Sequence, residues 1–128
     1  MKPGIYPILY TFFEDNDTLC HDPLLMQVDT ILSASASGVT ILGLGAEVSK
    51  LTFQERVDAL RIVAKRSNGR KPLSVTVYYD TVAEQINFSK YSTECGASGL
   101  ILQPPSQKMD EANLVNFFSE IIASVSSW

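Results

Sequence analysis

Four short apolar runs recur along the chain, and each is followed by apolar residues at helical spacing. The apolar runs, which predict strands, lie at residues 5–12, 39–43, 73–79 and 99–103. The helical patterns lie at about residues 24–32, 52–68, 81–96 and 110–122. The sequence therefore predicts strands and helices in strict alternation, with the period of about 30 residues that is typical of βαβ units.

The starts and ends of two helices carry specific signals. Thr52 and Glu55 are three residues apart before an apolar face, which is the spacing of a capping box. Asn68-Gly69 predicts the end of the same helix. Asp22 is the expected N-cap of the first helix, with Pro23 as its first residue.

Strands that alternate with helices require parallel pairing and right-handed crossovers, so the fold class is α/β. Two architectures fit. One is an open doubly wound sheet, and the other is (βα)4, half of a TIM (β/α)8 barrel, whose full length is about 250 residues. Ser74 and Thr76 alternate with apolar residues in the third run, which favours the half barrel, because a central doubly wound strand is usually apolar on both faces. We expect residues 1–128 to form a single domain.

Composition and charge exclude several classes of function. The net charge of −4 and the lack of a basic run argue against nucleic-acid binding. No apolar run is long enough to span a membrane, and the acidic close of the first segment is wrong for a signal peptide, so we expect a cytoplasmic protein. The distant Cys20 and Cys95 and the lone His21 predict neither a disulfide framework nor a zinc site.

The glycines after the second strand pose the main question. Residues Gly43-Leu44-Gly45-Ala46-Glu47 lack the third glycine of a dinucleotide fingerprint, and no P-loop lysine follows. One interpretation is a backbone nest, in which Gly45 lets N–H groups turn toward an anion such as a substrate carboxylate. The other is a tight turn that only connects strand to helix. The pattern alone leaves both open.

Over nearly its full length the chain resembles the family of dihydrodipicolinate synthase and N-acetylneuraminate lyase. The segments that carry the resemblance are GIYPILYTFFEDNDTL, SGVTILGLGAEVSKLTFQERVDAL, GRKPLSVTVYYDT and CGASGLILQPPSQ, in that order. The second of them stands where the family has its strand-two motif, glycine-threonine-threonine-glycine-glutamate, followed by a leucine-rich helix start.

The resemblance implies a (β/α)8 barrel that is commonly tetrameric, so we expect a homo-oligomer. It implies Schiff-base aldolase or lyase chemistry on pyruvate or another 2-keto acid, with the amine supplied by a lysine of the sixth strand. No metal or organic cofactor is implied. Gly43, Leu44, Gly45 and Glu47 take the positions of the motif that binds the keto-acid carboxylate through backbone N–H groups. A tyrosine after the fourth strand relays protons.

The chain departs from the family in three places. It stops at Trp128, before the strand that bears the lysine, so we expect no catalysis by this chain alone and self-association through exposed strand edges. Leu44 and Gly45 replace the two threonines of the motif. Ser106 takes the position of the proton-relaying tyrosine, and Tyr79 is a candidate for a tyrosine that reaches a neighbouring subunit's site. The alternative is a non-catalytic α/β module for small-anion binding or for a subunit interface.

Overall fold

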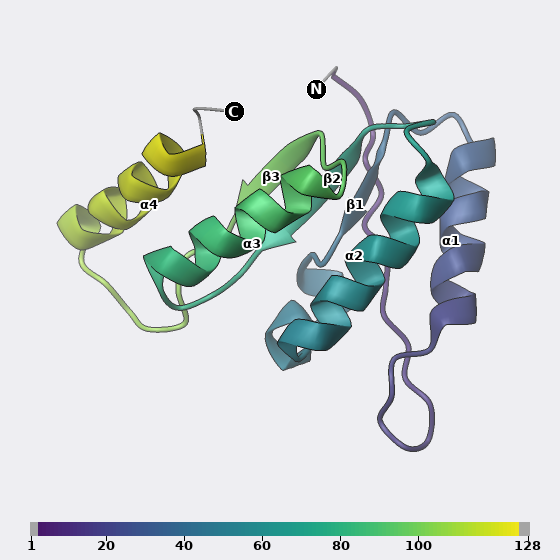
Figure 1. Ribbon diagram of the computed structural model, residues 1–128, viewed down its shortest axis with the longest axis horizontal. Coiled ribbons are helices and arrows are strands. Elements are labelled where there is room, and N and C mark those ends of the chain that lie inside the picture. Colours follow the sequence, from purple (N-terminus) through teal and green to yellow (C-terminus); the bar gives the residue numbers. More distant parts are fainter. Residues whose placement is uncertain (1–2, 126–128) are drawn as a thin grey trace.

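The computed structural model describes residues 3–125, in which helices and strands alternate after an extended first segment (Figure 1). The helices are α1 (His21–Ser33), α2 (Phe53–Ser67), α3 (Val82–Glu94) and α4 (Glu111–Val125). The strands are β1 (Val39–Ile41), β2 (Leu73–Val77) and β3 (Gly99–Leu102). They form a parallel sheet in the order β1-β2-β3. All four predicted helices are present.

The predicted first strand is only partly formed. Residues 5–12 run parallel to β1 and pair with it through a single bridge, between Ile8 and Thr40. Backbone N–H groups of Leu9 and Thr40 donate across this bridge, to Thr40 O at 2.9 Å and to Pro7 O at 2.8 Å. Pro7 has no N–H to extend the ladder, and the residues after Leu9 turn to other partners. The prediction of a full strand over 5–12 is therefore wrong, although the segment takes the place of the first strand.

The helices cover one face of the sheet. Side chains of α1, α2 and α3 form one buried cluster with the apolar residues of alternate strand positions. These strand residues are Leu9, Val39, Ile41, Leu73, Val75, Val77, Leu100 and Leu102. The intervening residues, such as Thr40, Ser74 and Thr76, belong to the opposite face by strand alternation. A doubly wound sheet carries helices on both faces, so that alternative is wrong and the arrangement is that of (βα)4, half of a barrel.

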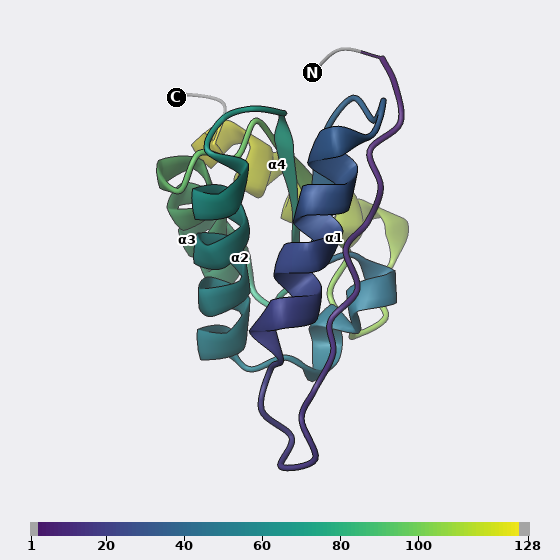
Figure 2. The same cartoon turned by 90° about the vertical axis from the view of Figure 1, so that its right-hand side faces the viewer.

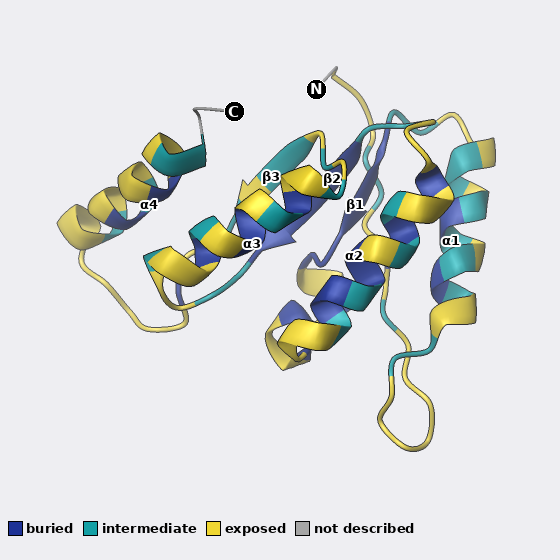
Figure 3. Cartoon of the chain, viewed as in Figure 1, coloured by how far each residue is buried: buried dark blue, intermediate teal, exposed yellow. Residues whose placement is uncertain are grey.

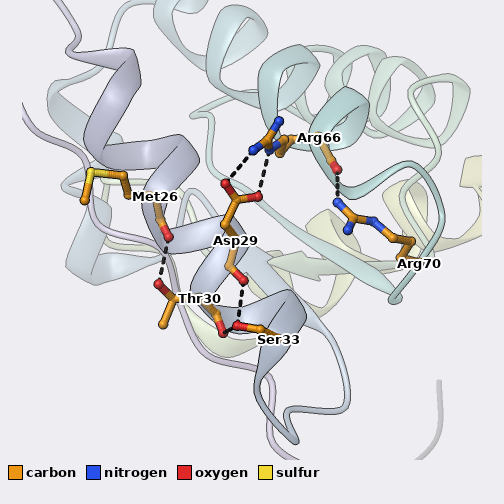
Figure 4. A network of polar contacts seen from close by, with 6 residues as sticks. All are labelled: Met26, Asp29, Thr30, Ser33, Arg66 and Arg70. Carbon is orange, nitrogen blue, oxygen red and sulfur yellow. Dashed lines mark hydrogen bonds and ion pairs between the residues drawn. The ribbon is translucent and has the colours of Figure 1, made fainter.

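An ion pair at the surface joins helices α1 and α2. Arg66 of α2 donates from Nε and Nη2 to the two carboxylate oxygens of Asp29 in α1, at 2.7 and 2.6 Å (Figure 4). Arg70 in turn donates to the carbonyl of Arg66 at 2.7 Å. The two-point geometry fixes the orientation of the helices more than it adds stability, because an exposed ion pair is screened by water.

The observed N-cap agrees with the predicted one in α2 but not in α1. Thr52 Oγ1 accepts from the N–H of Glu55, and Glu55 Oε2 accepts from the N–H of Thr52 at 2.7 Å, which confirms the capping box of α2. Helix α2 ends at Ser67 with Asn68 as its C-cap, in agreement with the predicted stop at Asn68-Gly69. The cap predicted for α1 is wrong: Cys20 is the N-cap, and Pro23 lies inside the first turn, where its missing N–H costs no hydrogen bond. Among the described helices, none has the length and apolar character needed to cross a membrane.

Candidate functional site

The segment that follows β1 makes two short turns before α2 begins. Residues Leu44–Ala46 and Val48–Lys50 form 3-10 turns, and Glu47 between them has left-handed backbone angles, φ 49° and ψ 41°. The N–H groups of Ala46 and Glu47 donate to the carbonyls of Gly43 and Leu44, at 2.9 and 3.0 Å. We call residues 43–47 the glycine loop. It lies at the carboxyl end of β1, the edge at which parallel sheets usually bind ligands.

The first N–H groups of the glycine loop have no partner in the protein. Among the described residues, none accepts a hydrogen bond from the backbone N–H of Leu44 or of Gly45. The Leu44 side chain is 79% exposed, so water and small solutes reach this part of the loop. Adjacent backbone N–H groups without a partner at a strand end are suitable donors to an anion such as a carboxylate.

Gly43 and Gly45 leave space for side chains of the first segment to pack against the loop. A Cβ on Gly43 would lie 2.8 Å from Cγ2 of Ile8, and one on Gly45 would lie 2.9 Å from Cε1 of Tyr10. The left-handed residues that turn the chain here are Leu42 and Glu47, and Gly45 is not among the positive-φ residues. The predicted reason for Gly45, freedom to turn the backbone, is therefore wrong. The glycines let residues of the first segment approach the loop closely.

The first segment also fixes the glycine loop in place. Thr11 Oγ1 donates to the carbonyl of Ala46 at 2.8 Å. The side-chain amide of Gln27 brackets the backbone of Tyr10, because its Oε1 accepts from Tyr10 N at 2.9 Å and its Nε2 donates to Tyr10 O at 3.0 Å. Figure 2 shows this first segment running alongside α1, which carries Gln27. The loop is thus bonded to the first segment, which α1 in turn holds through Gln27.

Glu47, a predicted binding residue, contributes its backbone to the shape of the loop. Its carboxylate pairs with Lys50 Nζ at 2.9 Å on the surface, where both side chains are more than half exposed. An exposed pair of this kind contributes little stability. The structure thus places the Glu47 side chain with Lys50, and the left-handed Glu47 backbone joins the two 3-10 turns.

Ser106, the predicted catalytic position after the fourth strand, lies at the same edge of the sheet. It follows β3, and its backbone N–H donates to Asp80 Oδ1, after β2, at 2.6 Å. Hydrogen bonds from the N–H and hydroxyl of Ser106 hold the pKa of Asp80 below its ordinary value. Ser106 therefore joins the loops that follow two neighbouring strands.

Tyr79 is not brought to the glycine loop. It belongs by alternation to the helix side of the sheet, the side of Val77. Its ring centroid lies 5.4 Å from that of Phe88, and the Arg56 guanidinium lies 4.5 Å from it. Burial raises the pKa of the Tyr79 phenol, whose hydroxyl has no hydrogen-bond partner in the described part of the chain. Tyr78 is half-buried and also packs against the buried cluster.

Arg56 is a residue of this edge that the sequence reasoning missed. It is buried, and it donates from Nε to the carbonyl of Leu51 at 3.1 Å and from Nη1 to the carbonyl of Tyr78 at 2.5 Å. It ties the segment after the glycine loop to the end of β2. Its signal in the sequence is its position three residues after Phe53 and four before Leu60, on the apolar face of α2.

The described residues offer no metal site and no buried amine at this edge. No group of three or more His, Cys, Asp or Glu side chains lies close enough to hold a metal ion within residues 3–125. Lys50, Lys90 and Lys108 are exposed. A Schiff-base amine has to be unprotonated, through desolvation or a neighbouring cation, so exposed lysines of this kind are poor nucleophiles.

The model of the dihydrodipicolinate synthetase family matches residues 1–127. The chain belongs to this family. It is 28% identical over 123 residues to YagE, a putative 2-dehydro-3-deoxy-D-gluconate aldolase of Escherichia coli K12, covering 95% of this chain and 41% of YagE. It is 27% identical over 126 residues to the 4-hydroxy-tetrahydrodipicolinate synthase of Methanococcoides burtonii, covering 98% of this chain and 43% of the synthase.

Solved structures of the family have the same fold as the chain. The crystal structure of YagE in complex with pyruvate superposes with a TM-score of 0.88 at 28% identity, covering 96% of this chain and 42% of YagE. The 4-hydroxy-tetrahydrodipicolinate synthase of Methylacidiphilum fumariolicum SolV superposes with a TM-score of 0.90 at 21% identity, covering 98% of this chain and 42% of that chain. The chain thus spans about two fifths of the length of these relatives, and it folds as their N-terminal half barrel.

Proposed function

We propose that this chain is the carboxylate-binding half of a Schiff-base aldolase or lyase that acts on pyruvate or another 2-keto acid. The observation that carries the proposal is the pair of unpartnered N–H groups of Leu44 and Gly45, at the position of the family's strand-two motif. A relative that is 28% identical to this chain has been solved with pyruvate, which supports this class of ligand.

In this proposal each part of the chain has a limited task. The N–H groups of Leu44 and Gly45 donate to the carboxylate, and Thr11 and Arg56 hold the backbone around them. The small side chains of Thr40, Ser74 and Thr76 lie on the barrel side of the sheet, where they are buried. The hydroxyl of Ser106, whose backbone N–H donates to Asp80, takes the place of the relay tyrosine. The amine comes from a further part of the barrel, because the lysines named above are exposed.

The partner of this half barrel is a further proposal. Ile8 and Ile101 lie on the face without helices and are exposed. A second half that covers this face buries them, whether it belongs to a longer polypeptide or to another copy of this chain. We therefore propose that the unit of residues 1–128 works as part of an oligomer or of a completed barrel.

A titration of the ¹⁵N-labelled chain with pyruvate tests the carboxylate site. We expect saturable shifts of the Leu44 and Gly45 amide signals, because direct hydrogen bonds to a carboxylate change their environment. Methyl pyruvate, which has the keto group but no carboxylate, is the matched control and should leave both signals in place. Equal shifts with both compounds, or none with pyruvate, contradict the proposal.

The second candidate is a small-anion binding module without catalysis, and the exposure of Lys50, Lys90 and Lys108 favours it. Borohydride trapping with pyruvate separates the two candidates when a polypeptide that completes the barrel is added. Covalent trapping only in the completed barrel supports the enzyme half. Pyruvate binding without trapping in either sample supports the binding module.

A further inference from the structure

Tyr10 lies directly against the glycine loop. A Cβ on Gly45 would lie 2.9 Å from Cε1, 3.4 Å from Cδ1 and 3.7 Å from Cζ of Tyr10. Cζ is the carbon that bears the hydroxyl, so the polar end of the ring is part of this contact. The Tyr10 side chain is 57% exposed. A large aromatic side chain is therefore open to solvent beside one of the unpartnered N–H groups.

The position of Tyr10 is fixed on both sides of its α-carbon. The Gln27 amide makes a hydrogen bond with the N–H and another with the carbonyl of Tyr10. The next residue, Thr11, donates to the carbonyl of Ala46 in the glycine loop. The backbone of Tyr10 and the glycine loop therefore keep one relative position. In the described part of the chain, no residue makes a hydrogen bond to the Tyr10 hydroxyl.

We infer that Tyr10 is a ligand-contacting residue of the carboxylate site. Its ring forms one wall of the site, and its hydroxyl donates a hydrogen bond to the carboxylate that the N–H groups of Leu44 and Gly45 hold. This inference rests on the proposed function. A carboxylate has about four lone-pair positions on its two oxygens, so it accepts a third donor without losing the first two. A hydroxyl is a good donor for this purpose because the bond is charge-assisted.

Tyr10 and Gly45 act as one unit in this arrangement. A side chain at position 45 would occupy the space of the Tyr10 ring, and the ring would have to move away from the N–H groups. The glycine is therefore needed for the position of the phenol. This gives Gly45 a role in binding that its backbone angles do not require.

Pyruvate titrations of three variants of the ¹⁵N-labelled chain test the inference. Tyr10→Phe keeps the ring and removes only the hydroxyl, and we expect the Kd for pyruvate to rise about tenfold. Tyr91→Phe removes a hydroxyl that is buried without a partner in the helix layer, near Arg61, and should leave the Kd unchanged. Gly45→Ala should also raise the Kd about tenfold, because the ring is displaced.

The double variant Tyr10→Phe/Gly45→Ala distinguishes a shared mechanism from two separate effects. If the methyl group acts by moving the phenol, the double variant should bind as weakly as either single variant, since the hydroxyl can be lost only once. Additive losses would overturn the coupling of the two residues.

The outcomes separate this inference from the proposed function. Shifts of Leu44 and Gly45 in the wild type with an unchanged Kd in Tyr10→Phe overturn the role of Tyr10 and leave the carboxylate site standing. A wild type in which pyruvate shifts neither amide overturns the carboxylate site, and the role of Tyr10 falls with it. A higher Kd for pyruvate in Tyr10→Phe, with an unchanged Kd in Tyr91→Phe, supports both the carboxylate site and the role of Tyr10.

Discussion

Helices α2 and α4 are both 15 residues long, but they are buried to very different degrees. Helix α2 buries six residues: Arg56, Val57, Ala59, Leu60, Val63 and Ser67. Helix α4 buries two, Phe117 and Ile121, although its sequence is the more apolar. Val115 and Ile122 of α4 are 57% and 51% exposed. Figure 3 shows the contrast between the buried side of α2 and the mostly exposed α4.

The difference comes from the neighbours of each helix. Helix α2 packs on α1 and on β2, and it contributes several residues to the central cluster. Helix α4 packs mainly on α3, and neither of its buried residues belongs to that cluster. Apolar residues are buried only where another element covers them, and in the described part of the chain the outer side of α4 is left exposed. The α1–α2 end is thus self-sufficient, and the α4 end is not.

The largest expected effect is a difference in core truncation between the two helices. Leu60→Ala in α2 should lower the free energy of unfolding by about 4 kcal/mol, because it opens a cavity in the central cluster. Ile121→Ala should cost about 2 kcal/mol, the low end of the usual range, because α4 has room to shift toward α3. Urea unfolding followed by circular dichroism measures both. Equal losses would show that α4 is as firmly held as α2.

The second effect concerns the caps at the start of each helix. Thr52→Ala removes the capping box of α2 and should cost about 1 kcal/mol of global stability. Asp110 Oδ1 accepts from the N–H of Asn113 at 2.8 Å at the start of α4. Asp110→Ala should instead raise amide exchange in the first turn of α4, with less effect on the unfolding midpoint, because α4 opens locally. A loss of global stability equal to that of Thr52→Ala would contradict this separation.

The features predicted correctly were those set by nearby residues. The capping box and the end at Asn68 need only neighbours along the chain, and the helical spacing of apolar residues was sufficient for all four helices. The half barrel was favoured over the doubly wound sheet by the alternation of Ser74 and Thr76, and the single helix-covered face agrees with it. Local sequence patterns were therefore sufficient to predict the architecture.

The details of the site depend on contacts between distant segments. The reason for Gly45 is the ring of Tyr10, 35 residues earlier, and no local pattern shows such a contact. Tyr78 and Tyr79 follow the end of β2 and both pack against the central cluster, whereas the contact of Tyr79 with Phe88 and Arg56 joins segments that are distant in the sequence. Arg56 was overlooked because a charged residue is expected on the surface. Here the guanidinium is buried, and it donates hydrogen bonds to two backbone carbonyls.

The third prediction uses alkaline pH on the well-packed side of the sheet. Burial raises the pKa of Tyr79 in the folded state above its unfolded value of about 10. The stabilisation from the neutral phenol is complete below that unfolded value and is lost as the pH rises toward the folded pKa. Tyr79→Phe should remove the loss of stability that begins as the pH rises above about 10, which unfolding midpoints measured as a function of pH detect. Tyr10→Phe, at an exposed ring, is the control and should keep it.

The smallest expected change in monomer stability comes from the exposed side of α4. Val115→Ser/Ile122→Ser should change the free energy of unfolding by less than about 0.5 kcal/mol per site, since both side chains are largely exposed. The same pair should weaken self-association in sedimentation velocity, because it removes exposed apolar surface from α4. Asn116→Ser, on an exposed position of the same helix, is the matched control. Unchanged association in the double variant would move the contact away from α4, toward the face of the sheet that carries Ile8 and Ile101.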